Sequence, residues 1–281
     1  MTTNNFTMLA QNSNDNYVQQ ACLAAMSIRA TNNNASICLI TNDVVPDKYK
    51  QLFDHIIEIP WGDHASDSDW KIENRWKIYH AVPYDETVVI DTDMLILQDI
   101  SSWFDFLRNY DLFFTSNVYT YRGELVTSDY YRKAFTKFDL PNLYSGLHWF
   151  KKSDLPHEFY KWLEMITNNW QQFYKAHAGG KVYQKTCSID LSAAITAKIM
   201  NCENQITNNR VKYPSFTHMK PKIQNWQDNF TDKWQNRVGV YLSEDLVLKI
   251  GNFTQTGIFH YTEKDFVNPH IMNIYEKHLG I

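Results

Sequence analysis

The first half of the chain alternates short apolar runs with stretches of helical periodicity. The apolar runs predict strands at 6–10, 36–40, 55–59, 87–90 and 112–114. Helices are predicted between them at 16–29, 46–53, 70–81 and 103–107, the last with Ser101 as its N-cap, and a loop expected to be mobile is predicted at 61–69. Strands that alternate with helices favour an α/β fold, with a mostly parallel twisted sheet flanked by helices.

The second half is less regular. A turn at 144–146 is followed by a predicted strand at 147–150, and helices are predicted at 156–170 and 188–200, the latter capped by Ser188. The last predicted strand covers 257–261. Because no linker rich in Pro, Gly or Ser and no internal repeat divides the chain, we expect one domain over 1–281.

The run from Val88 to Leu97 is apolar except around Asp91 and Asp93. Residues two apart in an extended backbone point to the same side, so two carboxylates would meet at the end of a buried strand. Such a pair is costly unless a cation lies between the two charges, and hard oxygen ligands suit Mg²⁺ or Mn²⁺. Asp-x-Asp triplets also arise by chance in turns and helix caps, but the buried strand favours the metal interpretation.

Polar residues follow three of the predicted strands. Gln11 and Asn12 follow the first, Asn42 the second and Asp91 the fourth. Ligands of open α/β sheets bind at the carboxyl ends of the strands, so these residues are expected to converge on one nucleotide site.

Composition narrows the class of protein. Apolar residues make up 44% of the 281 residues, ample for a large core, and the net charge of −4 with scattered basic residues gives no indication of nucleic-acid binding. The four cysteines lack metal-binding spacing and are expected to be reduced thiols. No apolar signal segment and no run of ~18 apolar residues is seen, so we expect a cytoplasmic protein without a transmembrane segment. No glycine-rich phosphate motif of kinases, ATPases or nicotinamide enzymes is present.

Several segments in order resemble glycosyltransferase family 8, which contains glycogenin and bacterial lipopolysaccharide galactosyltransferases. They are Leu9-Ala10-Gln11-Asn12, Tyr17, the segment of Lys77, the run Ile90 to Leu97, Ile100 and Trp103-Phe104. The resemblance is best over residues 6–107 and implies a GT-A fold. It also implies that 1–107 is the nucleotide-binding half, and that 108–281 binds the acceptor and closes the site.

The resemblance assigns the following roles in the first half. Leu9, Gln11, Asn12 and Tyr17 would line the uridine pocket, Lys77 would reach the diphosphate or the sugar, Asp91 and Asp93 would hold the metal, and Thr92 would lie near the ribose. From the residues alone, Tyr17 could instead pack on the sheet and Lys77 could be a solvated charge.

Further roles follow in the second half. Ser145-Gly146 is similar to the family's Asn-Ser-Gly with Tyr144 in place of Asn, and Asp190 is similar to the Asp of its Asp-Gln pair with Leu191 in place of Gln. His260 resembles the late metal-binding histidine, and Lys264 the phosphate-binding lysine; the segment from His218 to Pro221 is a rival for both. Without the resemblance, Ser145-Gly146 could be only a turn, Asp190 a helix-terminal acid and His260 a core histidine.

The function implied is a metal-dependent retaining transfer of a hexose, glucose or galactose, from a UDP-sugar to a hydroxyl of a carbohydrate or other acceptor. Mn²⁺ or Mg²⁺ would be the cofactor, with Asp190 at the sugar and Lys77 at the leaving group as catalytic residues. Two other classes stay open: a sugar-nucleotide hydrolase or nucleotidyltransferase, and a catalytically silent carbohydrate-binding protein on the same fold. The acceptor and the oligomeric state cannot be inferred from this pattern.

Overall fold

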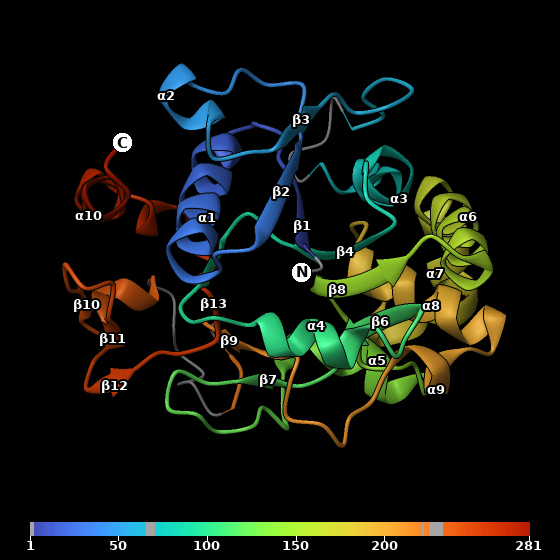
Figure 1. The fold of residues 1–281 in the computed structure, drawn as a ribbon. Helices are drawn as coiled ribbons and strands as arrows, with labels where there is room; N and C mark the ends of the chain where they lie inside the picture. The colour runs from blue at the N-terminus through green and yellow to red at the C-terminus, as the bar shows by residue number, and fades with distance from the viewer. Residues whose placement is uncertain (1–2, 66–70, 221, 225–232) are drawn as a thin grey trace.

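The computed structural model describes residues 3–65, 71–220, 222–224 and 233–281. Its largest sheet has six strands in the order β3-β2-β1-β4-β8-β6 (Figure 1). These strands are β1 (Asn4–Leu9), β2 (Ala35–Ile40), β3 (His55–Ile57), β4 (Glu86–Ile90), β6 (Leu112–Thr115) and β8 (Tyr144–Lys151). The first four run parallel, and β8 is antiparallel to both β4 and β6. The predicted strands and the mostly parallel sheet are therefore confirmed.

Helices cover both faces of this sheet. On one face lie α1 (Tyr17–Thr31), α4 (Ser101–Leu107) and α10 (Pro269–Leu279); on the other lie η1 (Ile72–Lys77), α3 (Ile78–Ala81), α6 (Asp154–Asn168) and α8 (Ile189–Met200) (Figure 1). The side chains of β4 alternate between the two cores, because Val88 and Ile90 pack with α1 while Val89 packs with α6 and α8. A strand buried on both faces has to be apolar throughout, which is the pattern that predicted it.

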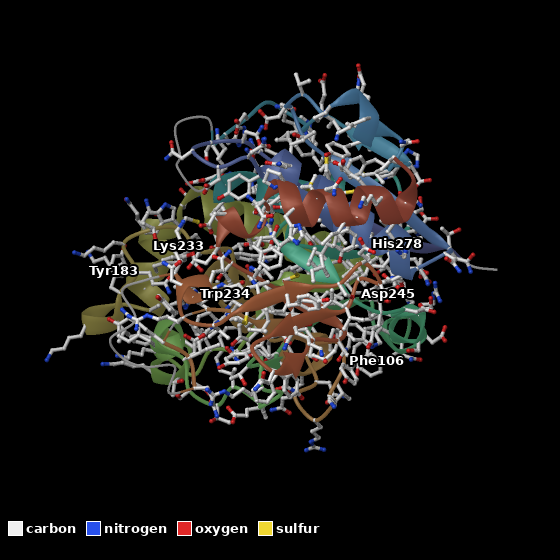
Figure 2. All side chains as sticks on the ribbon, turned by 90° about the vertical axis from the view of Figure 1, so that its left-hand side faces the viewer. Phe106, Tyr183, Lys233, Trp234, Asp245 and His278 are labelled. Carbon is white, nitrogen blue, oxygen red and sulfur yellow. The ribbon has the colours of Figure 1, made fainter. Side chains whose placement is uncertain are left out.

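Two smaller sheets complete the fold. One has the order β5-β13-β9-β7 and consists of β5 (Met94–Ile96), β7 (Val118–Tyr119), β9 (Phe216–His218) and β13 (Ile258–His260). The other, β10-β11-β12, consists of β10 (Val240–Leu242), β11 (Leu248–Ile250) and β12 (Phe253–Thr254). Figure 2 faces this second sheet and α10, with Trp234 of η4 beside them. The sheet β5-β13-β9-β7 combines strands from both halves of the chain.

Short helices connect these elements. They are α2 (Asp47–Lys50), η2 (Tyr130–Arg132), α5 (Lys133–Lys137), α7 (Trp170–His177), η3 (Gly180–Val182), α9 (Glu203–Ile206), η4 (Trp234–Asn236) and η5 (Lys264–Phe266). None of the helices in the described part of the chain is both long enough and apolar enough to cross a membrane. All four cysteines are free thiols, as predicted.

Some local predictions are confirmed and others are wrong. Ser188 caps α8 by accepting a hydrogen bond from Leu191 N. Ser101 is not a cap: it is the first residue of α4, and Asp99 accepts hydrogen bonds from its N–H and its hydroxyl. The turn predicted at 144–146 is part of β8, because pairing with β4 and β6 extends the strand beyond the apolar run.

The helix predicted at 70–81 divides into η1 and α3, and its first residue lies outside the described residues. The same holds for residues 66–69 of the predicted loop.

Candidate metal centre and its surroundings

Asp91, Asp93 and His260 lie together at the carboxyl end of β4. Each offers one ligand atom, and these atoms all lie within 4.8 Å of one another. Strand register brings them together, since β5 follows the two aspartates and pairs antiparallel with β13, with Met94 opposite His260. The His260 Nε2 atom is 3.1 Å from Asp93 Oδ2. The expected clustering of these three residues is thus present. His260 lies 167 positions after Asp93 in the sequence.

Two cations neutralise these carboxylates. Arg75 forms an ion pair with Asp91, and Lys264 Nζ is 2.7 Å from Asp93 Oδ2. Burial opposes ionisation of Asp93, but His260 and Lys264 outweigh it and hold the pKa of Asp93 well below its ordinary value. His260 and Lys264 therefore keep Asp93 charged.

The donor set fits a small divalent cation. Two carboxylates supply hard oxygen atoms and one imidazole supplies nitrogen, a combination that suits Mn²⁺ and Mg²⁺. The Nδ1 atom of His260 is buried and lacks a hydrogen-bond partner among the described residues. We note that His218, the rival ligand, is not part of the three-residue cluster; its ring stacks on that of His260 with 4.9 Å between centroids.

The residues expected around the uridine surround the first strand end. Leu9 ends β1 and is buried in the core with Trp76, while Gln11 is buried and accepts a hydrogen bond from Asn74 Nδ2 at 2.8 Å. Asn12 fixes the loop, because its side chain accepts from Val18 N at 3.0 Å and its N–H donates to Asp43.

Tyr17 and Thr92 both lie near the two carboxylates. Tyr17 is half-buried at the start of α1, and Lys264 Nζ lies 5.1 Å from the centroid of its ring. Thr92 is buried between the two aspartates, and its carbonyl accepts a hydrogen bond from Tyr261 Oη at 3.5 Å. Tyr17 thus lies near the charges of Lys264, Asp91 and Asp93.

Lys77 lies apart from the carboxylate cluster. Its side chain is fully buried, and its ammonium group donates to the carbonyl of Gly62. Burial lowers the pKa of Lys77, and the acids that act on it are Asp63 and Glu164 rather than the metal-binding pair. In this structure Lys77 holds the backbone of the 61–65 segment.

Asp190 is held at a fixed position in the first turn of α8. Its Oδ1 accepts from the N–H of Ser145 at 2.8 Å, and its Oδ2 lies 2.5 Å from Arg132 Nη2. The Ser188 side chain already caps the helix by accepting from Leu191 N, so α8 does not need Asp190 as its cap. Ser145 and Gly146 connect Asp190 with the metal cluster. The N–H of Ser145 donates to Asp190, and the carbonyl of Gly146 accepts from Asp91 N at 2.9 Å.

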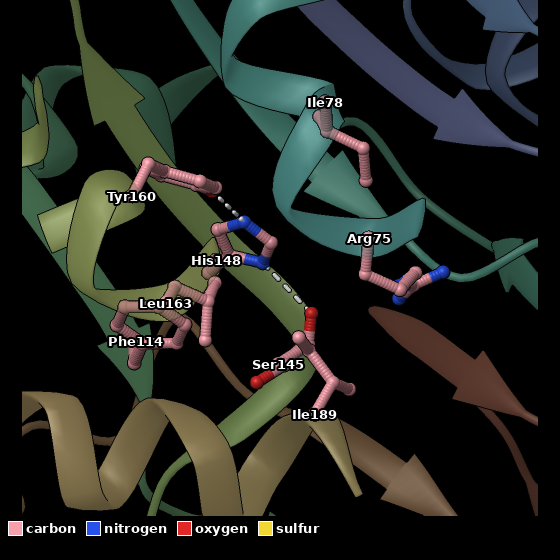
Figure 3. A pocket seen from close by; sticks show the side chains of 8 residues that line it. All are labelled: Arg75, Ile78, Phe114, Ser145, His148, Tyr160, Leu163 and Ile189. Atoms are coloured by element: carbon pink, nitrogen blue, oxygen red, sulfur yellow. Dashed lines mark hydrogen bonds between the residues drawn. The ribbon is translucent and has the colours of Figure 1, made fainter. Parts of the chain in front are cut away.

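A cavity of about 10 Å³, room for roughly one water molecule, lies beneath Ser145. His148 Nδ1 donates to the carbonyl of Ser145 at 2.7 Å, and in the neutral ring Nε2 accepts from the hydroxyl of Tyr160 at 2.7 Å (Figure 3). Arg75 borders the same cavity from η1. The backbone of Ser145, whose N–H holds Asp190, is therefore fixed by buried hydrogen bonds that run through His148 to Tyr160.

Sequence reasoning missed Arg75, Arg132 and His148. Arg75 had a signal, since it lies two residues before Lys77 in a segment already singled out. Arg132 and His148 had none, because each acquires its partner only through pairing of distant segments.

The chain was compared with known proteins. No protein-family profile and no curated protein sequence matches it. It superimposes on the galactosyltransferase LgtC, solved in complex with donor and acceptor sugar analogues, with 12% identity, 99% of this chain and 96% of LgtC covered, and a TM-score of 0.52.

Other matches include the glycosyltransferase GlyE of Streptococcus pneumoniae TIGR4, with 16% identity over 74% of this chain and a TM-score of 0.41, and the bifunctional glycosyltransferase WbbM, with 14% identity over 99% of this chain and a TM-score of 0.48. This chain spans 46% of the length of GlyE and 52% of WbbM. At these identities the likeness to LgtC establishes the fold, and the GT-A fold predicted from the sequence is confirmed.

Proposed function

We propose that this chain is a metal-dependent glycosyltransferase that transfers a hexose, glucose or galactose, from a UDP-sugar to an acceptor hydroxyl with retention of configuration. The observation that carries the proposal is the cluster of Asp91, Asp93 and His260 at the carboxyl edge of a mostly parallel sheet. Membership of family 8, which the sequence resembles, and a cytoplasmic location stay predictions.

The nucleotide is proposed to bind along the ends of β1 and β4. Tyr17 would pack against the uracil, with Leu9, Gln11 and Asn12 shaping the pocket and Thr92 beside the ribose. Asp91, Asp93 and His260 would hold Mn²⁺ or Mg²⁺, which when bound supplies a Lewis acid for the diphosphate.

The cations of the site are proposed to act on the leaving group. Arg75 and Lys264, which contact the carboxylates here, are placed to bind the diphosphate oxygens once a divalent cation neutralises Asp91 and Asp93. A fixed cation stabilises the negative charge that develops as the bond from the sugar C1 to the diphosphate breaks. The role of Lys77 on the diphosphate remains a proposal, and it requires the ammonium group to leave the carbonyl of Gly62.

The sugar is proposed to lie between the metal and Asp190, against Ser145 and Gly146. Asp190 would face the sugar, held by Arg132 and the Ser145 N–H. In the transfer, the bond between C1 and the diphosphate breaks with the electron pair going to UDP, and a bond from the acceptor oxygen to C1 forms. The proton of the acceptor hydroxyl passes to the departing diphosphate.

The test is UDP release over a panel of UDP-sugars, with Mn²⁺ or with a chelator, together with calorimetric titration of UDP. We expect Mn²⁺-dependent UDP binding that Asp93→Asn abolishes with an unchanged circular-dichroism spectrum. The matched control is Asp105→Asn, an exposed carboxylate on α4. Equal UDP affinity in Asp93→Asn and wild type would reject the metal centre.

The products of this assay also separate the alternatives. Free hexose with UDP from water alone would indicate a hydrolase, and formation of a UDP-sugar from UTP would indicate a nucleotidyltransferase. Sugar binding without metal and without UDP release would indicate a silent carbohydrate-binding protein.

A further inference from the structure

Beside Asp190, two tyrosines and three lysines form what we call the lysine–tyrosine cluster, consisting of Tyr130, Tyr131, Lys133, Lys220 and Lys222. The ammonium group of Lys220 lies 3.9 Å from the ring centroid of Tyr131. Those of Lys133 and Lys222 lie 4.1 Å and 5.0 Å from the ring centroid of Tyr130. The tyrosines remain 53% and 38% exposed, which leaves aromatic surface open to a ligand.

The backbone holds the two segments of the cluster together. An antiparallel bridge joins Asp129 to Ile223, and the N–H of Tyr130 donates to the carbonyl of Lys222 at 3.3 Å. A further bond of 2.9 Å runs from Gln224 N to Ser128 O. The cluster is therefore a built feature of the fold, since segments some ninety residues apart are paired on either side of it.

The cluster carries positive charge that no described carboxylate pairs with directly. Among the residues that the structure describes, none of its three ammonium groups lies within 4.0 Å of a carboxylate. The neighbouring Arg132 is different, because its guanidinium is paired with Asp190 and lies 3.9 Å from Asp129. Lys220 is half-buried, and burial together with the charge of Arg132 lowers its pKa. Because both effects disfavour the charged ammonium group, a bound anion would stabilise it.

The position of the cluster ties it to the transfer site. Arg132 directly follows Tyr131 in η2 and reaches Asp190, the residue proposed to face the sugar. Lys220 follows β9, whose last residue, His218, stacks on His260. A molecule resting on the tyrosines would thus have one end near the sugar and the metal cluster.

We propose that the lysine–tyrosine cluster binds the acceptor, and that this acceptor is a saccharide bearing a carboxylate or phosphate group. The inference rests on the proposed function, because it names the substrate class of that same site. The C–H face of a sugar ring packs on exposed aromatic rings, and ammonium groups form strong charge-assisted hydrogen bonds with carboxylates and phosphates. With a neutral acceptor, the three ammonium groups would gain no anionic partner.

The experiment compares probes that differ at one position of the sugar. Methyl β-glucoside, methyl β-glucuronide and methyl β-glucoside 6-phosphate, and the matching galactose series, are titrated into the protein with Mn²⁺ and UDP and followed by saturation-transfer NMR. Lys220→Met and Lys222→Met remove one charge each. Lys212→Met is the matched control, because Lys212 makes the same kind of contact, 5.1 Å from the ring of Tyr213, outside the cluster.

In the wild type, at least one anionic probe should bind about tenfold more tightly than its neutral parent. Lys220→Met should reduce this preference about fivefold or more, Lys222→Met should reduce it less, and Lys212→Met should keep it. Raised salt should weaken the preference. Comparison of the glucuronide with the 6-phosphate identifies which anion the site takes.

Equal binding of charged and neutral probes in both series would overturn the inference, and so would a preference that both cluster variants retain. Mn²⁺-dependent UDP binding is measured on the same samples. If the protein binds UDP with Mn²⁺ but shows no preference for anionic probes, only the anionic acceptor is rejected. If Mn²⁺-dependent UDP binding is absent but the protein prefers anionic probes through Lys220, the transferase is rejected and the anionic saccharide site is kept.

Discussion

Gly146 passes so close to Asp91 that a Cβ atom added to the glycine would lie 2.5 Å from Asp91 Oδ2. The same two residues are joined through their backbones, since Asp91 N donates to the carbonyl of Gly146 at 2.9 Å. The close approach therefore requires glycine on β8 for the carboxylate to keep its place in the metal cluster.

Gly146→Ala should weaken Mn²⁺ binding by about tenfold or more, because the new methyl group displaces a metal ligand. The atom it meets is the end of a side chain that can rotate, so the fold should survive. Manganese affinity is measured by electron paramagnetic resonance and folding by thermal melting. Gly239→Ala is the control, since a Cβ there meets nothing within 4 Å. Wild-type Mn²⁺ affinity in Gly146→Ala would contradict the assignment of Asp91.

The two stacked histidines should respond differently to substitution. His260→Phe should reduce Mn²⁺ affinity on the order of a hundredfold, because it removes a ligand atom from the cluster. His218→Phe keeps an aromatic ring against His260 and should cost no more than about tenfold. Both are compared by Mn²⁺ titration; the reverse order of effects would make His218 the ligand.

Arg75→Met should lower kcat/KM about a hundredfold or more, because it removes a fixed cation from the developing charge of the diphosphate. Arg29→Met is a suitable control, since its guanidinium pairs with Asp54 far from the metal cluster. Steady-state kinetics with a UDP-sugar and Mn²⁺ would decide, and activity within about threefold of wild type would remove Arg75 from the mechanism.

The same assay tests Lys77. If this lysine reaches the diphosphate, Lys77→Ala should lower turnover by about a hundredfold. Turnover within about threefold of wild type, with a lower melting temperature, would confine Lys77 to holding the carbonyl of Gly62.

The product formed from an α-linked UDP-sugar should be α-linked, and Asp190→Asn should form it much more slowly. Asp190 is the carboxylate held towards the proposed sugar site, and amidation removes its charge while keeping its shape. Proton NMR of the first product reports the configuration. Asp139→Asn, an exposed carboxylate paired with Lys198, is the control. A β-linked product would reject retention, and a fully active Asp190→Asn would leave retention intact while removing Asp190 from catalysis.

Stability should fall as the pH drops below about 6.5. Burial lowers the pKa of His148 from 6.5 to about 3, so the folded protein keeps this ring neutral while the unfolded chain takes up a proton. Between these two values the unfolded state binds more protons, and the free energy of unfolding decreases as the pH falls. His148→Phe should flatten this dependence in urea titrations at several pH values. An unchanged slope would show that His148 titrates alike in both states.

Local patterns determined much of this fold. The apolar run before Asp91 predicted a strand buried on both faces, and the carboxylates at its end predicted the cation site, because both depend only on neighbours in the sequence. The cap of α8 at Ser188 follows from the same kind of local hydrogen bond. His260 was added only through the family resemblance, because an apolar strand that ends in histidine by itself indicates a core histidine.

Tertiary structure decided which cations meet these acids. Arg75 and Lys77 are two residues apart in a 3₁₀ turn, where three residues complete one turn, so their side chains diverge: one reaches Asp91 and the other Gly62. Arg132 in η2 pairs with Asp190 in α8, two elements that are far apart in the sequence. The closeness of Gly146 to Asp91 depends on how β8 aligns with β4. Sequence periodicity specifies which face of an element is buried, but the contacts between distant elements are set by register and packing, and these bring the site together.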